Sequence, residues 1–174
     1  GLDSEMTLDR WDDSAKITYD HRVWNELCSL RFVESGHNAV IMGPVGVGKT
    51  FLATALGHAA VRRRYRVHFE RTDTMLRRLK ASRLDNSHDA EVRKLLRVDL
   101  LILDDFALSA LDAIDTAEVY ELIVERHRSS ATVVLRPTDD GICQYWRSSR
   151  ALPPPVPTPG AMGRMLAAGR GWTF

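Results

Sequence analysis

One short segment constrains the fold more than any other part of this 174-residue chain. Residues 43–50, GPVGVGKT, place a lysine and a hydroxyl residue directly after a glycine-rich turn. The glycines let backbone N–H groups converge on phosphate oxygens, the lysine adds positive charge, and the hydroxyl can ligate Mg²⁺. Such a loop needs a buried strand before it and a helix after it, because the positive end of the helix dipole then faces the phosphates. The segment therefore predicts an α/β fold with a phosphate-binding loop.

The sequence on both sides of the loop has the required pattern. Apolar runs predict strands at residues 39–42, 66–70, 100–103 and 131–135. Helical periodicity covers residues 20–33, 49–63, 72–84, 90–97 and 112–128. The run at 100–103 is continuous rather than alternating, which is typical of a strand that is covered on both faces in a parallel sheet. We therefore expect a doubly wound parallel sheet flanked by helices.

Two carboxylates, Asp104 and Asp105, directly follow the apolar run 100–103. A carboxylate at the carboxyl end of a strand beside a phosphate loop can hold Mg²⁺, which predicts a metal role for Asp104. A second carboxylate one position later can orient or deprotonate the attacking water, which predicts a general-base role for Asp105. Acidic residues often follow strands, so this prediction depends on the phosphate loop upstream.

The formal net charge of +1 conceals an uneven distribution along the chain. Residues 62–97 carry 12 basic and 5 acidic side chains, whereas residues 98–128 carry 2 basic and 8 acidic ones. A basic segment between acidic ones predicts a docking face for an anionic partner. The alternative is a solvated basic helix face without a partner.

Cysteine content and hydropathy restrict the cellular location. The two cysteines, Cys28 and Cys143, do not have the close spacing of a metal-binding pair, and reduced thiols are expected. No apolar run approaches the roughly 20 residues that span a bilayer. The chain does not open with a charged and then apolar signal segment. We therefore expect a cytoplasmic protein that does not engage a membrane.

With these motifs in place, the chain resembles the IstB-type transposase helper proteins. These are insertion-sequence ATP-binding proteins similar to the bacterial helicase loader DnaC within the AAA+ class. The resemblance covers about residues 8–134 and rests on the phosphate loop and on residues 27–34, 52–58, 98–106 and 120–126. It implies an AAA+ P-loop fold with a five-stranded parallel sheet and ATP and Mg²⁺ as cofactors. It also implies a homo-oligomer on duplex DNA that directs a partner transposase.

Position by position, the resemblance implies roles for individual residues. Nucleotide binding is expected from Gly43, Pro44, Val45, Gly46, Val47, Gly48, Lys49, Thr50 and Phe51. Lys49 and Asp105 are the expected catalytic residues, and Thr50 and Asp104 the expected Mg²⁺ ligands. The basic segment falls where related proteins have a DNA-facing helical insertion, so phosphate contacts are expected from Arg77, Arg78, Lys80 and Arg83. These residues lack interleaved aromatics, which favours contact that does not depend on DNA sequence.

The chain departs from the family pattern at both ends. The resemblance implies a longer amino-terminal region than the one in this sequence. Related proteins also place a polar sensor, Thr-Ser-Asn, after the fourth strand, whereas this chain has Leu135-Arg136-Pro137. Residues 136–174 hold six of the seven prolines and have no acidic residue or lysine after Asp140. We interpret residues 1–135 as the AAA+ core and residues 136–174 as a frame-shifted tail, the alternative being an ordinary irregular one.

Three functional hypotheses follow from these departures. The first is an ATP-binding helper of DNA transposition whose hydrolysis is impaired, because the fifth strand, the lid and the arginine finger have no match in residues 136–174. The second is a DnaC-like replicative helicase loader. The third is a degraded nucleotide-binding remnant without turnover. Loss of the fifth strand would also leave the strand at 39–42 unpaired on one side.

Overall fold

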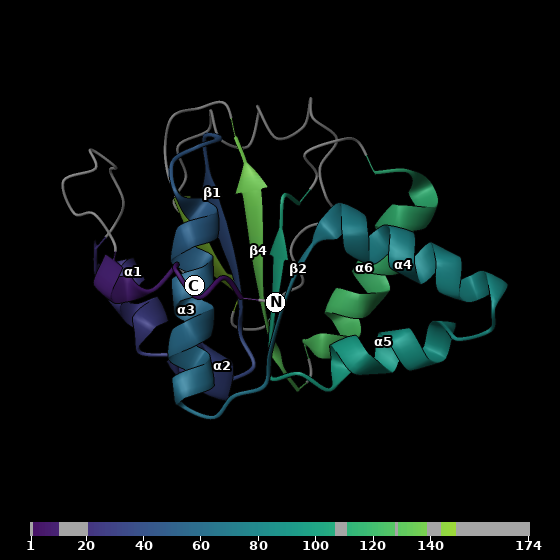
Figure 1. Ribbon diagram of the computed structural model, residues 1–174, viewed down its shortest axis with the longest axis horizontal. Helices are drawn as coiled ribbons and strands as arrows, with labels where there is room; N and C mark the ends of the chain where they lie inside the picture. Colours follow the sequence, from purple (N-terminus) through teal and green to yellow (C-terminus); the bar gives the residue numbers. More distant parts are fainter. Residues whose placement is uncertain (1, 11–20, 107–110, 128, 139–143, 149–174) are drawn as a thin grey trace.

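A computed structural model describes residues 2–10, 21–106, 111–127, 129–138 and 144–148, with one five-stranded sheet at its centre. The strands are β1 (Asn38–Gly43), β2 (Val67–Arg71), β3 (Leu100–Asp104), β4 (Ala131–Pro137) and β5 (Gln144–Ser148). They lie in the order β2-β3-β4-β1-β5 (Figure 1). Strands β1 to β4 are mutually parallel, and β5 runs antiparallel to β1. The predicted parallel sheet is therefore confirmed for four strands.

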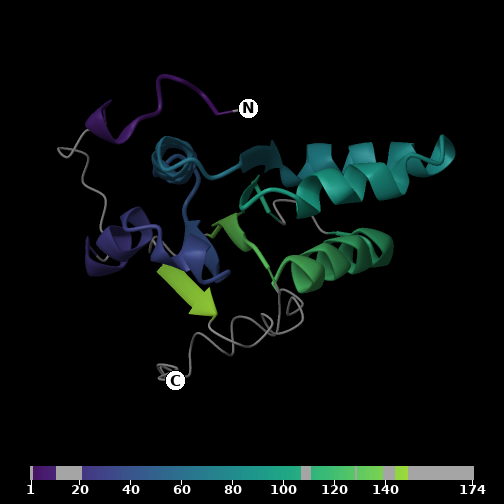
Figure 2. The same ribbon diagram turned by 90° about the horizontal axis from the view of Figure 1, so that it is seen from below.

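Helices cover both faces of this sheet, as Figure 2 shows. They are α1 (His21–Cys28), α2 (Arg31–Glu34), α3 (Lys49–Arg62), α4 (Thr72–Leu84), α5 (His88–Leu96) and α6 (Ala113–Arg126), with a short 3₁₀ turn at Leu8–Arg10. Apolar side chains of α1, α2 and α3 pack with Leu100 and Ile102 of β3 on one face. Those of α4, α5 and α6 pack with Leu101 and Leu103 on the other. The continuous apolar run of β3 thus reflects two separate cores.

The single helix predicted over residues 20–33 is divided into α1 and α2. Leu30 lies between them with a φ of 59°, in the left-handed region. That conformation costs roughly 1–2 kcal/mol for a residue with a Cβ. Leu30 is fully buried among Leu27, Phe32 and Val33. The free energy gained by burying a leucine side chain is about as large as the cost of this left-handed conformation.

The expectation that β1 would lack a partner on one side is wrong. Residues 38–42 of β1 pair with residues 144–148 of β5. A parallel connection needs a crossover of about a dozen or more residues. Only residues 138–143 separate β4 from β5, so the chain turns back and pairs in the antiparallel direction. The backbone groups of β1 are therefore satisfied on both edges without the fifth parallel strand that the resemblance implies.

The predicted boundary at residue 135 does not coincide with the end of the sheet. Strand β4 continues to Pro137, and β5 also lies within the predicted tail. Residues 139–143 and 149–174 of that tail lie outside the described residues. Within the described part of the chain, no helix is both long enough and apolar enough to cross a membrane.

Candidate functional site

The phosphate loop connects the end of β1 to the start of α3 at the carboxyl edge of the sheet. Gly46 and Gly48 have φ values of 84° and 89°, which glycine adopts without the strain that a Cβ would cause. The first N–H groups of α3 have no partner within the helix, and the helix dipole adds positive charge there. The loop therefore has the backbone geometry of an anion site, with Val45 exposed at its tip.

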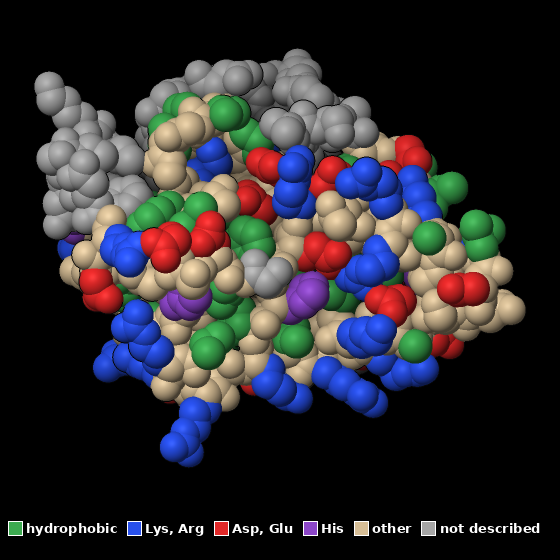
Figure 3. Space-filling view, in the orientation of Figure 1, with side chains coloured by type: hydrophobic (Ala, Val, Ile, Leu, Met, Phe, Trp, Pro, Cys, Tyr) green, Lys and Arg blue, Asp and Glu red, His purple; other side chains and the backbone are tan. Residues whose placement is uncertain are grey.

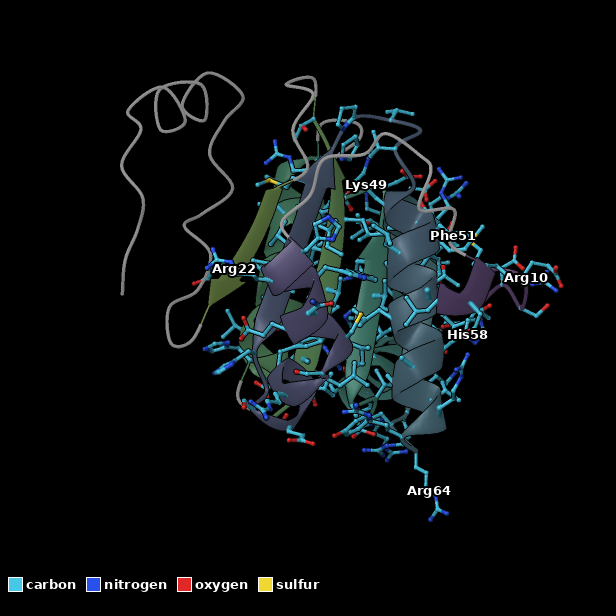
Figure 4. All side chains as sticks on the ribbon, turned by 90° about the vertical axis from the view of Figure 1, so that its left-hand side faces the viewer. Arg10, Arg22, Lys49, Phe51, His58 and Arg64 are labelled. Carbon is cyan, nitrogen blue, oxygen red and sulfur yellow. The ribbon has the colours of Figure 1, made fainter. Side chains whose placement is uncertain are left out.

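Lys49 lies at the first position of α3, and its side chain folds back over the loop (Figure 4). Its Nζ donates to the backbone oxygens of Gly43 at 2.7 Å and of Pro44 at 2.6 Å. Only 8% of the residue is exposed. These bonds hold a buried positive charge inside the loop, where it can meet the oxygens of a bound phosphate.

Thr50 and Asp104 bring two oxygen ligands together beside the loop. The Thr50 hydroxyl donates to Asp104 Oδ2 at 2.8 Å, although the two residues lie 54 positions apart in the sequence. Asp104 is 5% exposed, and its other carboxylate oxygen accepts from the N–H of Asp105 at 2.8 Å. Mg²⁺ prefers hard oxygen ligands and commonly combines one or two protein groups with phosphate oxygens and water. The pair fits the predicted metal site.

Asp105 lies at the same edge of the sheet, with a φ of 52°. Its Oδ2 is 3.4 Å from Nη2 of Arg71, whose Nε also lies 3.4 Å from Asp73 Oδ1. Arg71 is the last residue of β2, and the sheet register places it beside Asp104. The sequence reasoning missed Arg71, although a charged residue at the end of the neighbouring strand was the available signal. Arg71 therefore forms an ion pair with one oxygen of the Asp105 carboxylate, which we predicted to act on water.

Thr138 is a second residue that the sequence reasoning missed. Because β4 continues through Pro137, the first polar side chain after it is Thr138, three positions beyond the predicted strand end. Its N–H donates to the Gly43 oxygen at 3.0 Å, the same oxygen that accepts from Lys49. Its hydroxyl oxygen is buried and makes no hydrogen bond within the described residues. A polar group therefore does follow β4 at the loop, despite the Leu135-Arg136-Pro137 segment.

The four predicted DNA contacts lie on α4, and the structure pairs each of them with carboxylates. Arg77 lies 3.3 Å from Asp73, Arg78 contacts Glu70 and Glu91, Lys80 contacts Asp112 and Asp115, and Arg83 contacts Glu118. A phosphate would have to compete with these carboxylates. The DNA role of the four residues stays a prediction, and their pairing argues against it.

The strongest of these pairs joins Arg78 to Glu70. Arg78 Nη2 and Nε lie 2.6 and 3.2 Å from the two Glu70 oxygens, and His68 Nε2 lies 3.1 Å from one of them. Burial by itself would raise the pKa of Glu70. The hydrogen bonds from His68 and Arg78 and the Arg78 charge outweigh burial and lower the pKa of Glu70 to about 2.

This lowered pKa predicts an acid-dependent loss of stability. The unfolded-state pKa of a glutamate is about 4.3, so the stabilisation is complete above that value and is lost as pH falls toward 2. At pH 7, Glu70→Gln should lower the free energy of unfolding by on the order of 2 kcal/mol, and the difference from wild type should shrink toward pH 2. Urea unfolding followed by circular dichroism at several pH values measures it. The control is Glu121→Gln, an exposed glutamate of α6; a difference for Glu70→Gln that does not change with pH would contradict the prediction.

Known proteins are similar to this chain in sequence. The family described as IstB-like ATP binding protein matches residues 1–147. An ATP-binding protein in an insertion sequence of Mycobacterium tuberculosis is 34% identical over 134 residues, which are 77% of this chain and 53% of the relative. The insertion sequence IS1162 ATP-binding protein of Pseudomonas fluorescens is 38% identical over 117 residues, 67% of this chain and 51% of the relative. The chain thus spans about half the length of the curated relatives it matches.

Solved structures with a similar fold include two replication proteins. The replication initiator DnaA bound to AMPPCP and single-stranded DNA has a TM-score of 0.67 and 21% identity, covering 81% of this chain and 46% of that one. The DnaC helicase loader has a TM-score of 0.61 and 22% identity, covering 73% and 76%. At these identities the likeness shows the fold alone, and the predicted α/β P-loop fold is confirmed.

Proposed function

Because this chain belongs to the family of IstB-like ATP-binding proteins, we propose that it is an ATP-binding helper of DNA transposition. The resemblance inferred from the sequence motifs is confirmed by the family match. In this proposal the chain binds ATP with Mg²⁺, assembles as a homo-oligomer on duplex DNA in the cytoplasm, and acts on a transposase. The observation that carries the nucleotide part is the meeting of Lys49, Thr50 and Asp104 at the phosphate loop.

Each residue of the site has a role in this proposal. ATP supplies a phosphoanhydride bond, and Mg²⁺ offsets the charge of its phosphates. The Lys49 amine exchanges the Gly43 and Pro44 oxygens for phosphate oxygens, and the loop N–H groups donate to the same phosphates. Thr50 and Asp104 would hold Mg²⁺, because their side-chain oxygens lie side by side at the loop. Asp105 orients water once Arg71 releases its carboxylate oxygen.

The test uses the purified chain, a fluorescent ATP analogue, duplex DNA and the transposase of a related insertion sequence. We expect saturable nucleotide binding that weakens when Mg²⁺ is removed, and nucleotide-dependent retention of both DNA and transposase on the immobilised chain. Asp104→Asn should reduce the effect of Mg²⁺, because a neutral amide is a weaker ligand for a hard cation. Lack of nucleotide binding would refute the proposal. Retention of a replicative helicase in place of the transposase would identify a helicase loader instead.

A further inference from the structure

The positive charge of residues 62–97 is not available on α4. Its four basic residues, Arg77, Arg78, Lys80 and Arg83, face six carboxylates from β2, α4, α5 and α6: Glu70, Asp73, Glu91, Asp112, Asp115 and Glu118. Three of the pairs, Lys80–Asp112, Lys80–Asp115 and Arg83–Glu118, use residues close to the start of α6, more than 30 positions further along the chain. The α4 surface is therefore close to neutral or acidic, although its sequence is basic.

Arginines that are less compensated by carboxylates lie at the opposite edge of the sheet, near the amino ends of the strands, where Arg66 alone of the six residues below forms an ion pair among the described residues, with Asp99. We call six residues the basal arginine row: Arg31, Arg63, Arg64, Arg66, Arg93 and Arg97. All six are exposed, and among the described residues Arg31, Arg64, Arg93 and Arg97 form no ion pair. Figure 3 shows Lys and Arg side chains along this lower edge, over the end of α3 and over α5. Figure 4 shows Arg64 projecting away from the domain below α3.

Hydrogen bonds fix parts of the row to neighbouring elements of the fold. Arg63 donates to the Ser29 oxygen, which joins the end of α3 to the junction that precedes Arg31. Arg66 contacts both oxygens of Asp99 at 2.7 and 3.1 Å, and the N–H of Asp99 donates to the Arg66 oxygen at 2.9 Å. Arg97 lies two positions before Asp99. Arg93 lies one helical turn earlier, about 6 Å along α5.

A buried arginine fixes the segment that carries Arg97. Arg126 is fully buried and donates to the oxygens of Leu95 and Val98, which flank Arg97 in the sequence. It also donates to the Ala131 oxygen at 2.6 Å and to the Thr132 hydroxyl at 3.0 Å. The end of α5 is thereby tied to the first residues of β4. The backbone that carries Arg97 is therefore held in place, which reduces the entropy lost there when a ligand binds.

We propose that the basal arginine row binds the phosphate backbone of duplex DNA, an inference that rests on the DNA part of the proposed function. One guanidinium group can donate two parallel hydrogen bonds to phosphate oxygens. Contacts to the phosphate backbone do not distinguish one base sequence from another. Single-strand binders also need exposed aromatic rings for base stacking. Tyr65, the aromatic residue beside the row, packs against the core and donates its hydroxyl to Glu34 at 3.2 Å. Because the row and the phosphate loop lie at opposite edges of the sheet, DNA and nucleotide can bind together.

The test compares two triple variants of the full chain by titrating fluorescent duplex DNA over a range of salt concentrations. Each phosphate contact contributes about −0.9 to the slope of log K against log salt. Arg64→Gln, Arg93→Gln and Arg97→Gln together should flatten the slope by up to about 2.7. The matched control, Arg77→Gln, Lys80→Gln and Arg83→Gln together, removes the same charge from α4 and should leave the slope close to wild type.

The outcomes distinguish an error in the position of the DNA-binding surface from an error in the proposed DNA binding itself. Flattening by the α4 variant and not by the basal variant would overturn the inference and leave DNA binding intact. A wild-type chain that does not bind duplex DNA at low salt would refute the DNA part of the proposed function itself. If the basal triple variant does not fold, Arg64→Gln and Arg97→Gln alone should each flatten the slope by about 0.9, and unchanged slopes would overturn the inference. Nucleotide binding by each variant reports that its fold is intact.

Discussion

Replacing Lys49 with alanine should weaken binding of ATP with Mg²⁺ by about 10- to 100-fold. The amine is a buried cation that reaches the centre of the phosphate loop through two backbone oxygens. A hydrogen bond to a charged group contributes about 1.5–3 kcal/mol, and each 1.4 kcal/mol corresponds to about a tenfold change in affinity. Titration of a fluorescent ATP analogue measures the dissociation constants of both proteins.

The matched control is Lys94→Ala. Lys94 is an exposed lysine of α5 that pairs with Glu91 of its own helix. The Lys94→Ala variant loses the same side chain and the same charge as Lys49→Ala, but at a position far from the loop. Its dissociation constant for nucleotide should therefore equal that of the wild type. The prediction fails if Lys49→Ala binds nucleotide as tightly as the control does. Unfolding in urea shows whether Lys49→Ala also loosens the fold.

The parts of the site that could be predicted from the sequence are those whose role depends on residues close together in the chain. The glycines, Lys49 and Thr50 occupy consecutive positions, so their chemistry can be read without knowing the fold. Strand β3 was equally readable, because its alternate residues face two cores and all must be apolar. Asp104 then follows from its place at the carboxyl end of that strand. Its contact with Thr50 is the expected consequence of placing β1 and β3 in one parallel sheet.

The parts that the sequence did not predict depend on residues far apart in the chain. Arg83 is neutralised by Glu118, which a count of charges over residues 62–97 does not include. Lys80 is likewise paired with Asp115. The left-handed Leu30 carries no local signal, because leucine rarely adopts that conformation and only its burial compensates for it. Strand β5 was missed because its formation depends on the open edge of β1.

Hydrolysis is expected to be slow even when ATP is bound. An arginine that reaches the γ-phosphate from a neighbouring subunit is worth about 10³–10⁵ in rate in related phosphoryl-transfer systems. Of the four arginines after Asp140, Arg147 lies within β5, and Arg150, Arg164 and Arg170 lie outside the described residues. In addition, Arg71 occupies one oxygen of Asp105. Steady-state phosphate release should therefore remain at least about 10³-fold below that of a complete site, with or without duplex DNA.

Thr138 makes this prediction sharper, because its buried hydroxyl lies after β4 near the loop and has no hydrogen-bond partner within the described residues. If the hydroxyl positions water as a family sensor would, turnover will be measurable and Thr138→Val will abolish it. Asp105→Asn is the companion variant, since it removes the base and leaves the Thr50–Asp104 pair intact. DNA-stimulated phosphate release that disappears in Asp105→Asn would show that the site is complete. The interpretation of residues 136–174 as a loss of function would then be wrong, because β5 and Thr138 would belong to a working ATPase.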